Sequence, residues 1–415
     1  MKKVLALVLA AIMMLCASAM ADTSVSNTAA ELTGDPAAIK VGAVMLGDEN
    51  EGYTYAHIAG IQKAAEQLGI APEQIMWKYH VTEDATCYDA AADLADAGCD
   101  VVFSNSYGHQ TYMQQVAAEF PEVQFVAVTG DTANKSGLDN FSNAFNETFE
   151  SRYVSGVVAG MKIAEMIAEG SLAPENLDAN GNVKLGYVGA YPYAEVVSGY
   201  TAYYLGVKSV VENVVMDVTY TNSWFDITAE AEAANALLAS GCVMICQHAD
   251  STGAPSAVQA AREAGKNVYC VGYNIDMLSV APDAALTSAT NNWDVYYAYA
   301  MAQVINGEKI ARNWTAGYAE NAVCITALGS GAAAGTAEKV AEVEAALKDG
   351  SLKVFDTSTF TVGGEVVTST FATDTDGDFV YDADEAIIDG AYCESYYQSA
   401  PSFALRIDGI TELLN

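Results

Sequence analysis

The chain has 415 residues, with 53 acidic residues against 18 lysines and arginines, and therefore a formal net charge of -35. A surface this acidic repels nucleic acid and anionic lipid headgroups, which excludes both as expected partners. The length exceeds what one hydrophobic core usually organises and suits two lobes. The same charge favours a neutral or cationic ligand over a polyphosphate.

The N-terminus has the pattern of an export signal. A basic start precedes the apolar stretch Val4–Leu15, and Ala19 and Ala21 place small residues where a signal peptidase reads them. The apolar stretch is too short for a stable membrane-spanning helix. Residues 1–21 are therefore predicted to be a cleaved signal peptide, and the protein is expected to be exported to the periplasm or the cell surface.

Cys16 leaves a second mode of attachment open, in which a lipid on this cysteine anchors the chain to the membrane. Bacterial lipoprotein signals have a small residue before that cysteine, whereas this chain has Leu15. Cleavage after Ala21 is therefore the favoured prediction. The Ser/Thr/Ala-rich residues 22–39 are expected to form a tether between this site and the folded body.

Seven cysteines follow Cys16, and this odd number does not suggest a disulfide framework. Four of them lie in or beside apolar, strand-like runs, where free cysteine behaves as a small core residue. These are Cys99, Cys242, Cys246 and Cys270. Their spacing does not match a zinc site, so neither a metal site nor a cofactor is predicted.

The stretch Lys40–Gly60 reads as a strand, an acidic loop bounded by glycines, and a helix. The same plan begins again at Lys184, and the two halves then run in step. This repeat predicts an α/β protein with two Rossmann-like, doubly wound lobes and a cleft between them. The strands predicted for the first lobe are Val41–Leu46, Ile75–Val81, Val101–Ser104 and Val123–Thr129.

The repeat also sets the expected boundaries. Lobe one is predicted to cover residues 40–145, completed by residues about 290–310, and lobe two residues 146–289. Residues 311–415 are expected to be a C-terminal extension packed on the lobes. Within it the pattern predicts a helix at Thr336–Leu347, a hairpin that turns at Gly363-Gly364, and an acidic run at Asp374–Glu385.

Ligands of doubly wound sheets collect at the carboxyl ends of the strands. At these ends the sequence has aromatic rings, amides and carboxylates, with almost no lysine or arginine. Aromatic rings stack on flat molecules, and carboxylates and amides accept bonds from ring N–H groups and sugar hydroxyls. A neutral heteroaromatic ligand such as a nucleoside fits this set, and Tyr53 and Trp224 are the predicted stacking residues. His248, at a strand end beside Asp250, is a further candidate.

No nucleophile–base pair, phosphate-binding loop or His-rich metal motif is present, so no catalytic residue is predicted. A nucleoside hydrolase that gathers Asp48, Asp250 and Asp276 stays open as an alternative, as does a ligand sensor with the same fold. An EF-hand loop has glycine at its sixth position, whereas in the acidic run Asp374–Glu385 the glycine, Gly377, comes earlier. A solvated turn is therefore favoured there over a calcium site.

Several runs together resemble the PnrA-like (BMP-family) substrate-binding proteins of bacterial ABC importers. The matching runs are Gly52–Gly60, Glu150–Gly160, Tyr191–Val210, Thr221–Asp226, Cys246–Asp250, Val271–Met277 and Leu286–Asp294. The resemblance implies a type I periplasmic-binding-protein fold with a three-crossing hinge. It also implies a monomeric solute receptor, not an enzyme, that imports purine nucleosides or bases with a membrane permease.

By position, the resemblance implies that the purine is clamped between Tyr53 and Trp224. The other ligand-binding residues it implies are Asp48, Asn105, Asp250, Asn274 and Asp276. Asn291, in the segment that crosses between the lobes, is a further ligand-binding residue implied by position. The chain departs from the family at Ser198, where an arginine is common, and near Asn291, where many members carry a lysine. These departures leave a different base or a related small molecule open as the ligand.

Overall fold

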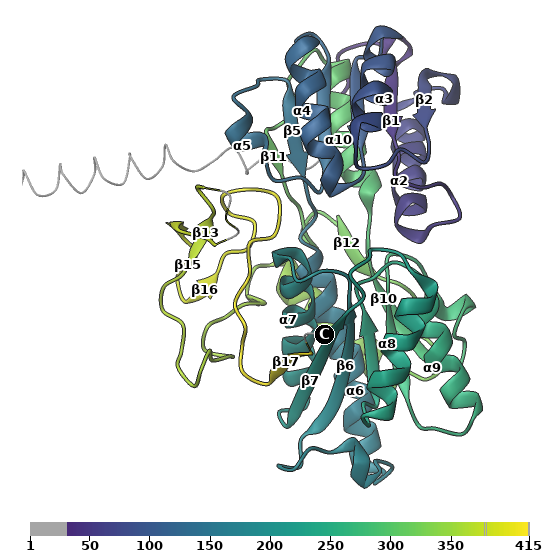
Figure 1. Cartoon of the computed structure of the whole chain (residues 1–415), viewed down its shortest axis with the longest axis vertical. Coiled ribbons are helices and arrows are strands. Elements are labelled where there is room, and N and C mark those ends of the chain that lie inside the picture. Colours follow the sequence, from purple (N-terminus) through teal and green to yellow (C-terminus); the bar gives the residue numbers. More distant parts are fainter. Residues whose placement is uncertain (1–30, 377, 379, 414–415) are drawn as a thin grey trace, which may run out of the picture.

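The computed structural model describes residues 31–413, apart from Gly377 and Phe379. The predicted signal peptide, Cys16 and residues 22–30 of the predicted tether lie outside the described residues. The chain forms two α/β lobes stacked end to end, with the C-terminal part along one side (Figure 1). In the described part of the chain, no helix is long and apolar enough to cross a membrane.

Lobe one contains a six-stranded parallel sheet with the order β11-β5-β4-β3-β1-β2. Its strands are β1 (Val41–Val44), β2 (Ile75–Lys78), β3 (Val101–Ser104), β4 (Gln124–Val128), β5 (Phe141–Ala144) and β11 (Asn313–Trp314). Its helices are α2 (Gly52–Leu68), α3 (Ala85–Asp96), α4 (Gln110–Glu119), α5 (Ala133–Ser136) and α10 (Trp293–Ile305).

Lobe two contains a seven-stranded mixed sheet with the order β12-β10-β9-β8-β6-β7-β17, in which only β12 runs antiparallel. Its strands are β6 (Val183–Gly189), β7 (Val214–Tyr220), β8 (Met244–Gln247), β9 (Tyr269–Tyr273), β10 (Ala285–Asn291), β12 (Val323–Ile325) and β17 (Ile410–Leu413). Its helices are α6 (Thr148–Ala168), α7 (Ala194–Lys208), α8 (Ile227–Ala239), α9 (Gly253–Glu263) and α11 (Thr336–Lys348).

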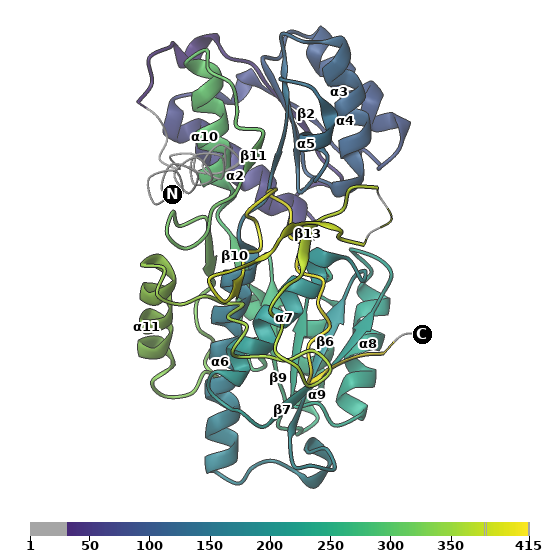
Figure 2. The same cartoon turned by 90° about the vertical axis from the view of Figure 1, so that its left-hand side faces the viewer.

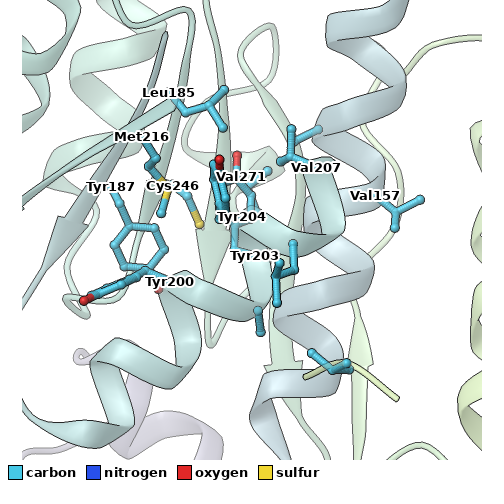
Figure 3. Close-up of a cluster of buried hydrophobic side chains, with 14 of the residues drawn as sticks. Val157, Leu185, Tyr187, Tyr200, Tyr203, Tyr204, Val207, Met216, Cys246 and Val271 are labelled. Atoms are coloured by element: carbon cyan, nitrogen blue, oxygen red, sulfur yellow. The ribbon is translucent and has the colours of Figure 1, made fainter. Parts of the chain in front are cut away.

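Successive side chains of a strand point to opposite faces of the sheet, so each strand contributes residues to the core on both faces. In β3, Phe103 packs with α2 and α10, whereas Val102 packs in the cluster of α3 and α4. In lobe two, Tyr187 and Leu185 belong to the large cluster beneath α6 and α7 (Figure 3). Burial on both faces explains why the strands read as nearly continuous apolar runs.

Helices α6 and α7 cross at glycines. A Cβ on Gly156 would lie 2.1 Å from the carbonyl oxygen of Tyr203, and a Cβ on Gly206 would lie 2.1 Å from that of Tyr153. Only glycine allows the two backbones to approach this closely. The contact fixes α6, which leaves the hinge, against the helix that follows β6.

Within residues 31–413, as far as they are described, three segments connect the lobes: β5 to α6, β10 to α10, and β11 to β12. This arrangement agrees with the type I periplasmic-binding-protein fold implied by the resemblance. Helix α10 returns to lobe one, where Trp293 and Tyr297 are buried against α2.

Some local predictions were wrong. Strand β2 ends at Lys78, and β5, with its polar Ser142 and Asn143, was not predicted. The predicted turn at Gly363-Gly364 is present, since Val362 and Glu365 bond to each other across it, but the flanking residues form one isolated bridge instead of two strands. The predicted helix at Thr336–Leu347 is confirmed as α11. The extension also contains two small antiparallel pairs, β13 (Phe371–Thr373) with β14 (Ala383–Glu385) and β15 (Ile387–Ile388) with β16 (Ala391–Tyr392).

The four cysteines predicted as core thiols are buried and free. In the acidic run, carboxylate oxygens of Asp374, Asp376 and Asp378 lie within 4.8 Å of one another. The backbone N–H groups of Asp376 and Asp378 donate to the preceding carboxylates, each at 3.2 Å. These bonds are those of successive tight turns, and a calcium ion there stays an untested alternative.

Candidate functional site

A cavity of about 330 Å³ lies between the lobes at the carboxyl ends of their strands. Lobe one contributes mainly the loop after β1, the start of α2 and the turn after β3. Lobe two contributes the start of α7 and the ends of β7, β8 and β9. Its lining residues from lobe two are Glu195, Trp224, Phe225, His248, Asp250 and Tyr273. This is the switch-point position at which doubly wound sheets bind ligands.

Tyr53 lines the cavity from the first turn of α2. The Glu51 side chain caps this helix by accepting from the N–H groups of Tyr53 (2.7 Å) and Thr54 (2.8 Å). The Tyr53 hydroxyl donates to the carbonyl oxygen of Asn105 at 2.5 Å, and its ring meets His57 edge-on at 4.6 Å. These contacts hold the half-buried ring in one orientation.

Trp224 lines the same cavity from the opposite lobe, in the loop between β7 and α8. Its ring meets Tyr191 edge-to-face at 5.3 Å and lies 6.3 Å from the ring of Tyr193. Its carbonyl oxygen accepts from the N–H of Asp250 at 2.7 Å. The lobes approach closely here, because Tyr193 also lies 6.3 Å from Tyr107 of lobe one.

Glu195 and His248 form part of the lobe-two wall. The His248 Nε2 lies 3.4 Å from the Glu195 carboxyl, and its Nδ1 lies 3.2 Å from the hydroxyl of Tyr187. Burial raises the pKa of Glu195 to about 7, opposed by the charge of Arg152. Burial also lowers the pKa of His248 well below its ordinary value, and Arg152 adds to this. His248 is therefore neutral at pH 7.

Arg152 supplies a positive charge behind this wall without lining the cavity. It is fully buried in α6, donates from Nη1 to the Gln247 carbonyl oxygen at 2.6 Å, and lies 3.6 Å above the centre of the Tyr273 ring. Tyr273 itself lines the cavity. The Arg152 cation therefore influences the cavity indirectly, by its contact with the Tyr273 ring and by its electric field on the lining carboxyl groups.

Asp250 is a buried carboxyl at the end of β8, 8% exposed. Its Oδ1 accepts from the side-chain amide of Asn274 at 2.6 Å. Burial raises the pKa of Asp250 well above its ordinary value, and the negative charges of Glu51, Glu230 and Glu195 raise it further. A ligand that donates hydrogen bonds here would favour the ionised form.

Asp48 lines the cavity rim from lobe one. Its carboxylate accepts from the N–H of Asn50 at 2.9 Å and lies 3.2 Å from the ring of His80. The bond from the Asn50 backbone, more than any other contact, lowers the pKa of Asp48. It is therefore an ionised acceptor at neutral pH.

Five of the nine predicted site residues line the cavity. They are Tyr53, Trp224, Asp48, Asp250 and His248. The other four, Asn105, Asn274, Asp276 and Asn291, do not. Their roles as ligand contacts stay predictions, because nothing in the structure tests contact with a ligand.

Each of these four residues has a structural partner. Asn105 accepts from the N–H of Leu46 at 2.9 Å, and Asn274 donates to Asp250. Asp276 caps a turn by accepting from the N–H of Leu278, also at 2.9 Å. The Asn291 side chain accepts from the hydroxyl of Thr148 at 3.0 Å. Asn274, Asp276 and Asn291 border a separate hollow beside α2.

Sequence reasoning missed three important lining residues: Glu195, Tyr107 and Tyr273. Tyr107 and Tyr273 stand at or just after strand ends, so the rule that selected Trp224 applies to them equally. Glu195 gives no such signal, since it is the second residue of α7 and reads as an ordinary acidic residue of a first helical turn.

Among the residues that the structure describes, the lining carries four carboxyl groups and no lysine or arginine. The carboxyls are Asp48, Glu51, Glu195 and Asp250. Together with the rings of Tyr53, Tyr107, Trp224 and Tyr273, they make a cavity that can stack on a flat molecule and accept its N–H and O–H groups. A phosphate would find no counter-charge among these residues.

The two-lobed fold with its inter-lobe cavity is the type I periplasmic-binding-protein fold. A solute-binding protein of an ABC transporter system from Aeropyrum pernix has a similar structure, with a TM-score of 0.63 over 82% of this chain and 95% of that one, at 17% identity. At this identity the likeness concerns the fold alone.

The model of one family, described as ABC transporter substrate-binding protein PnrA-like, matches residues 40–349. The chain belongs to this family. It is 33% identical to a purine-binding protein of Brucella abortus, over 76% of this chain and 83% of that protein. It is also 27% identical to a putative ABC transporter glucose-binding protein of Haloferax volcanii, over 74% of this chain and 72% of that protein.

Proposed function

We propose that this substrate-binding protein captures a purine nucleoside or base, held flat between the rings of Tyr53 and Trp224. The observation that carries the proposal is the cavity lining, which in the described part of the chain combines aromatic rings from both lobes with carboxyl groups and contains no lysine or arginine. The similarity to a purine-binding protein points to the same ligand class. The volume of about 330 Å³ suits a ligand of this size.

The chemistry of binding follows from the two kinds of lining group. Stacking of a base on aromatic side chains contributes about 1–3 kcal/mol per base in nucleic-acid binders. The carboxylates of Asp48, Glu195 and Asp250 would accept from ring N–H groups, an exocyclic amine or ribose hydroxyls. These bonds would supply selectivity, since a ligand that lacks the donors leaves buried carboxylates unsatisfied.

The lobes would close about the three-stranded hinge when the ligand binds, and a membrane permease would recognise the closed form. The predicted signal peptide would export the protein to the periplasm or cell surface, with Cys16 as an alternative lipid anchor. We propose a monomer, since one chain supplies both walls of the site.

A receptor role is favoured over the nucleoside hydrolase considered above. Such an enzyme would need Asp48, Asp250 and Asp276 together, whereas Asp276 caps a turn beside a different hollow. Recovery of the bound nucleoside chemically unaltered would support the receptor, and release of free base would support the enzyme.

The proposal is tested by a thermal-shift screen followed by calorimetry. Adenine, adenosine, guanosine and inosine are the test ligands, adenosine monophosphate tests the exclusion of phosphate, and glucose tests the alternative raised by the Haloferax relative. A ligand at 100 times its Kd adds about 2.7 kcal/mol of apparent stability. Stabilisation by glucose and by no purine would overturn the proposed ligand class.

A further inference from the structure

Residues 350–413 lie beyond the part of the chain that the family model matches. Most of this segment, here called the strap, is firmly attached to lobe two. Its last strand, β17, pairs in parallel with β7 from Ile410 to Leu413. Within it, Phe355 stacks on Phe403 at 4.3 Å, and both rings are buried in the lobe-two core.

The strap also bonds to lobe one. The side-chain amide of Asn134, in α5, donates to the carbonyl oxygen of Tyr397 at 3.0 Å. The ammonium group of the neighbouring Lys135 donates to the carbonyl oxygen of Asp374. The N–H of Ser399 donates to Asn313, in β11, at 3.2 Å. Figure 2 shows the strap in yellow between lobe one above and α7 below.

The strap touches the back of the ligand-site wall as well. Pro401 borders a residual space of about 10 Å³ together with Glu195, Ser198 and His248, so the packing between strap and wall is close. Nearby, the carboxyl of Glu394 is 3% exposed and interacts with the Ser198 side chain. Strap residues thus fill the space behind the site.

We propose that the strap ties lobe one to lobe two and thereby limits how far the receptor opens. Because the strap is fixed to lobe two by sheet pairing and buried aromatic rings, each bond from it to α5 or β11 is in effect a bond between the lobes. Opening about the hinge must break or stretch these bonds. The strap therefore favours a lobe separation near that of the binding-competent form.

A restrained hinge has a definite consequence for binding. The apparent affinity falls with the fraction of molecules in the competent form. A strap that raises this fraction strengthens binding without touching the ligand, and it slows release because release needs opening.

The test uses the double variant N134A/K135A, which removes both side-chain donors from α5 to the strap. Both residues are exposed, so the fold should persist. The matched control is N306A/K309A, which also removes an asparagine and a lysine. In that control, the lost bonds join Asn306 to Glu31 and Thr33, and Lys309 to Asp139, all outside the strap.

Small-angle X-ray scattering of the ligand-free proteins should show a larger radius of gyration for N134A/K135A than for the wild type and the control. Stopped-flow binding should show affinity weakened by about fivefold or more, mostly as faster release, consistent with the loss of two hydrogen bonds. Equal radii of gyration and equal release rates in N134A/K135A and the control would overturn the proposal that the strap limits opening.

The scattering measurement needs no ligand, so the strap can be tested even if purines do not bind. A purine that binds wild type and N134A/K135A alike, with equal radii, would reject the strap and leave the proposed function intact.

Discussion

Replacing Trp224 by alanine is the most direct test of the proposed clamp. The ring belongs to the lobe-two wall, is half-buried, and meets the Tyr191 ring edge-to-face at 5.3 Å. The backbone bond from Asp250 to the Trp224 carbonyl oxygen does not depend on the side chain. The substitution therefore removes a stacking surface and leaves the loop anchored.

The expected loss follows from the stacking energy. Removal of about 1–3 kcal/mol of base stacking weakens binding by about 5- to 150-fold. We expect the affinity of Trp224→Ala to fall by at least about tenfold. Tyr191 and Tyr193 make contacts of their own, so neither ring can move into the space that the Trp224 ring leaves. The lost aromatic contact should lower the free energy of unfolding by about 0.5–1.5 kcal/mol, too little to unfold the protein.

Isothermal titration calorimetry with the best purine from the screen measures this effect, and a thermal melt confirms the fold. Trp77→Ala is the matched control, because Trp77 lies in β2, stacks on Tyr79 at 5.7 Å and does not line the cavity. Unchanged affinity in Trp224→Ala, or an equal loss in both variants, would refute the clamp.

Three further predictions concern buried carboxyls and helix packing. Affinity should fall at most about tenfold per pH unit as the pH drops below about 7, because the ionised Glu195 accepts ligand N–H groups; Glu195→Gln should flatten this calorimetric profile. Burial raises the pKa of Glu394 to about 8, so unfolding releases its proton between about pH 5 and 8. The free energy of unfolding should therefore fall as the pH rises through this range, by up to about 1.4 kcal/mol per pH unit, and Glu394→Gln should reduce that slope in urea titrations. Gly156→Ala should lower the free energy of unfolding by about 1–3 kcal/mol in the same assay, because its Cβ would meet the Tyr203 carbonyl oxygen; a near-neutral result would contradict the tight crossing.

The fold was predictable from the sequence because it depends on local patterns that occur twice. Apolar strand, glycine-bounded loop and periodic helix recur in both lobes, and parallel strands buried on both faces leave a strong hydrophobic signal. The exception is instructive: β5 was missed because Ser142 and Asn143 interrupt its apolar pattern. The Asn143 side chain donates to the carbonyl oxygen of Ala127 in the core, so tertiary bonding makes a polar residue acceptable there.

The candidate site was predictable where the rule of strand ends applied. It identified Tyr53 and Trp224, which line one cavity from opposite lobes. Asn274 and Asp276, which the resemblance implied and which follow the end of β9, do not line it. Strand ends determine which residues come near the cleft, but not which way each side chain turns, and a short polar side chain readily bonds to nearby backbone instead.

Beyond the turn at Gly363-Gly364, little of the strap could be predicted from local patterns. Its strands have two to four residues, and its buried rings Phe355, Tyr392 and Phe403 are far apart in sequence and find one another only in the folded chain. Irregular segments of this kind derive their order from tertiary packing rather than from propensity. The resemblance to the family offered no guide either, because the match ends at residue 349.

The electrostatics of the site connect these observations. The cavity lining is acidic, yet Arg152 lies fully buried behind Tyr273, and its field lowers the pKa of Glu195 and Asp250 against the effect of burial. A cation placed in the cavity itself would bond to these carboxylates and occupy their lone pairs. Placed behind an aromatic ring, it partly stabilises their charge while leaving their oxygens free for a ligand. An acidic cavity arranged in this way keeps its carboxylate oxygens available to a neutral ligand that donates hydrogen bonds.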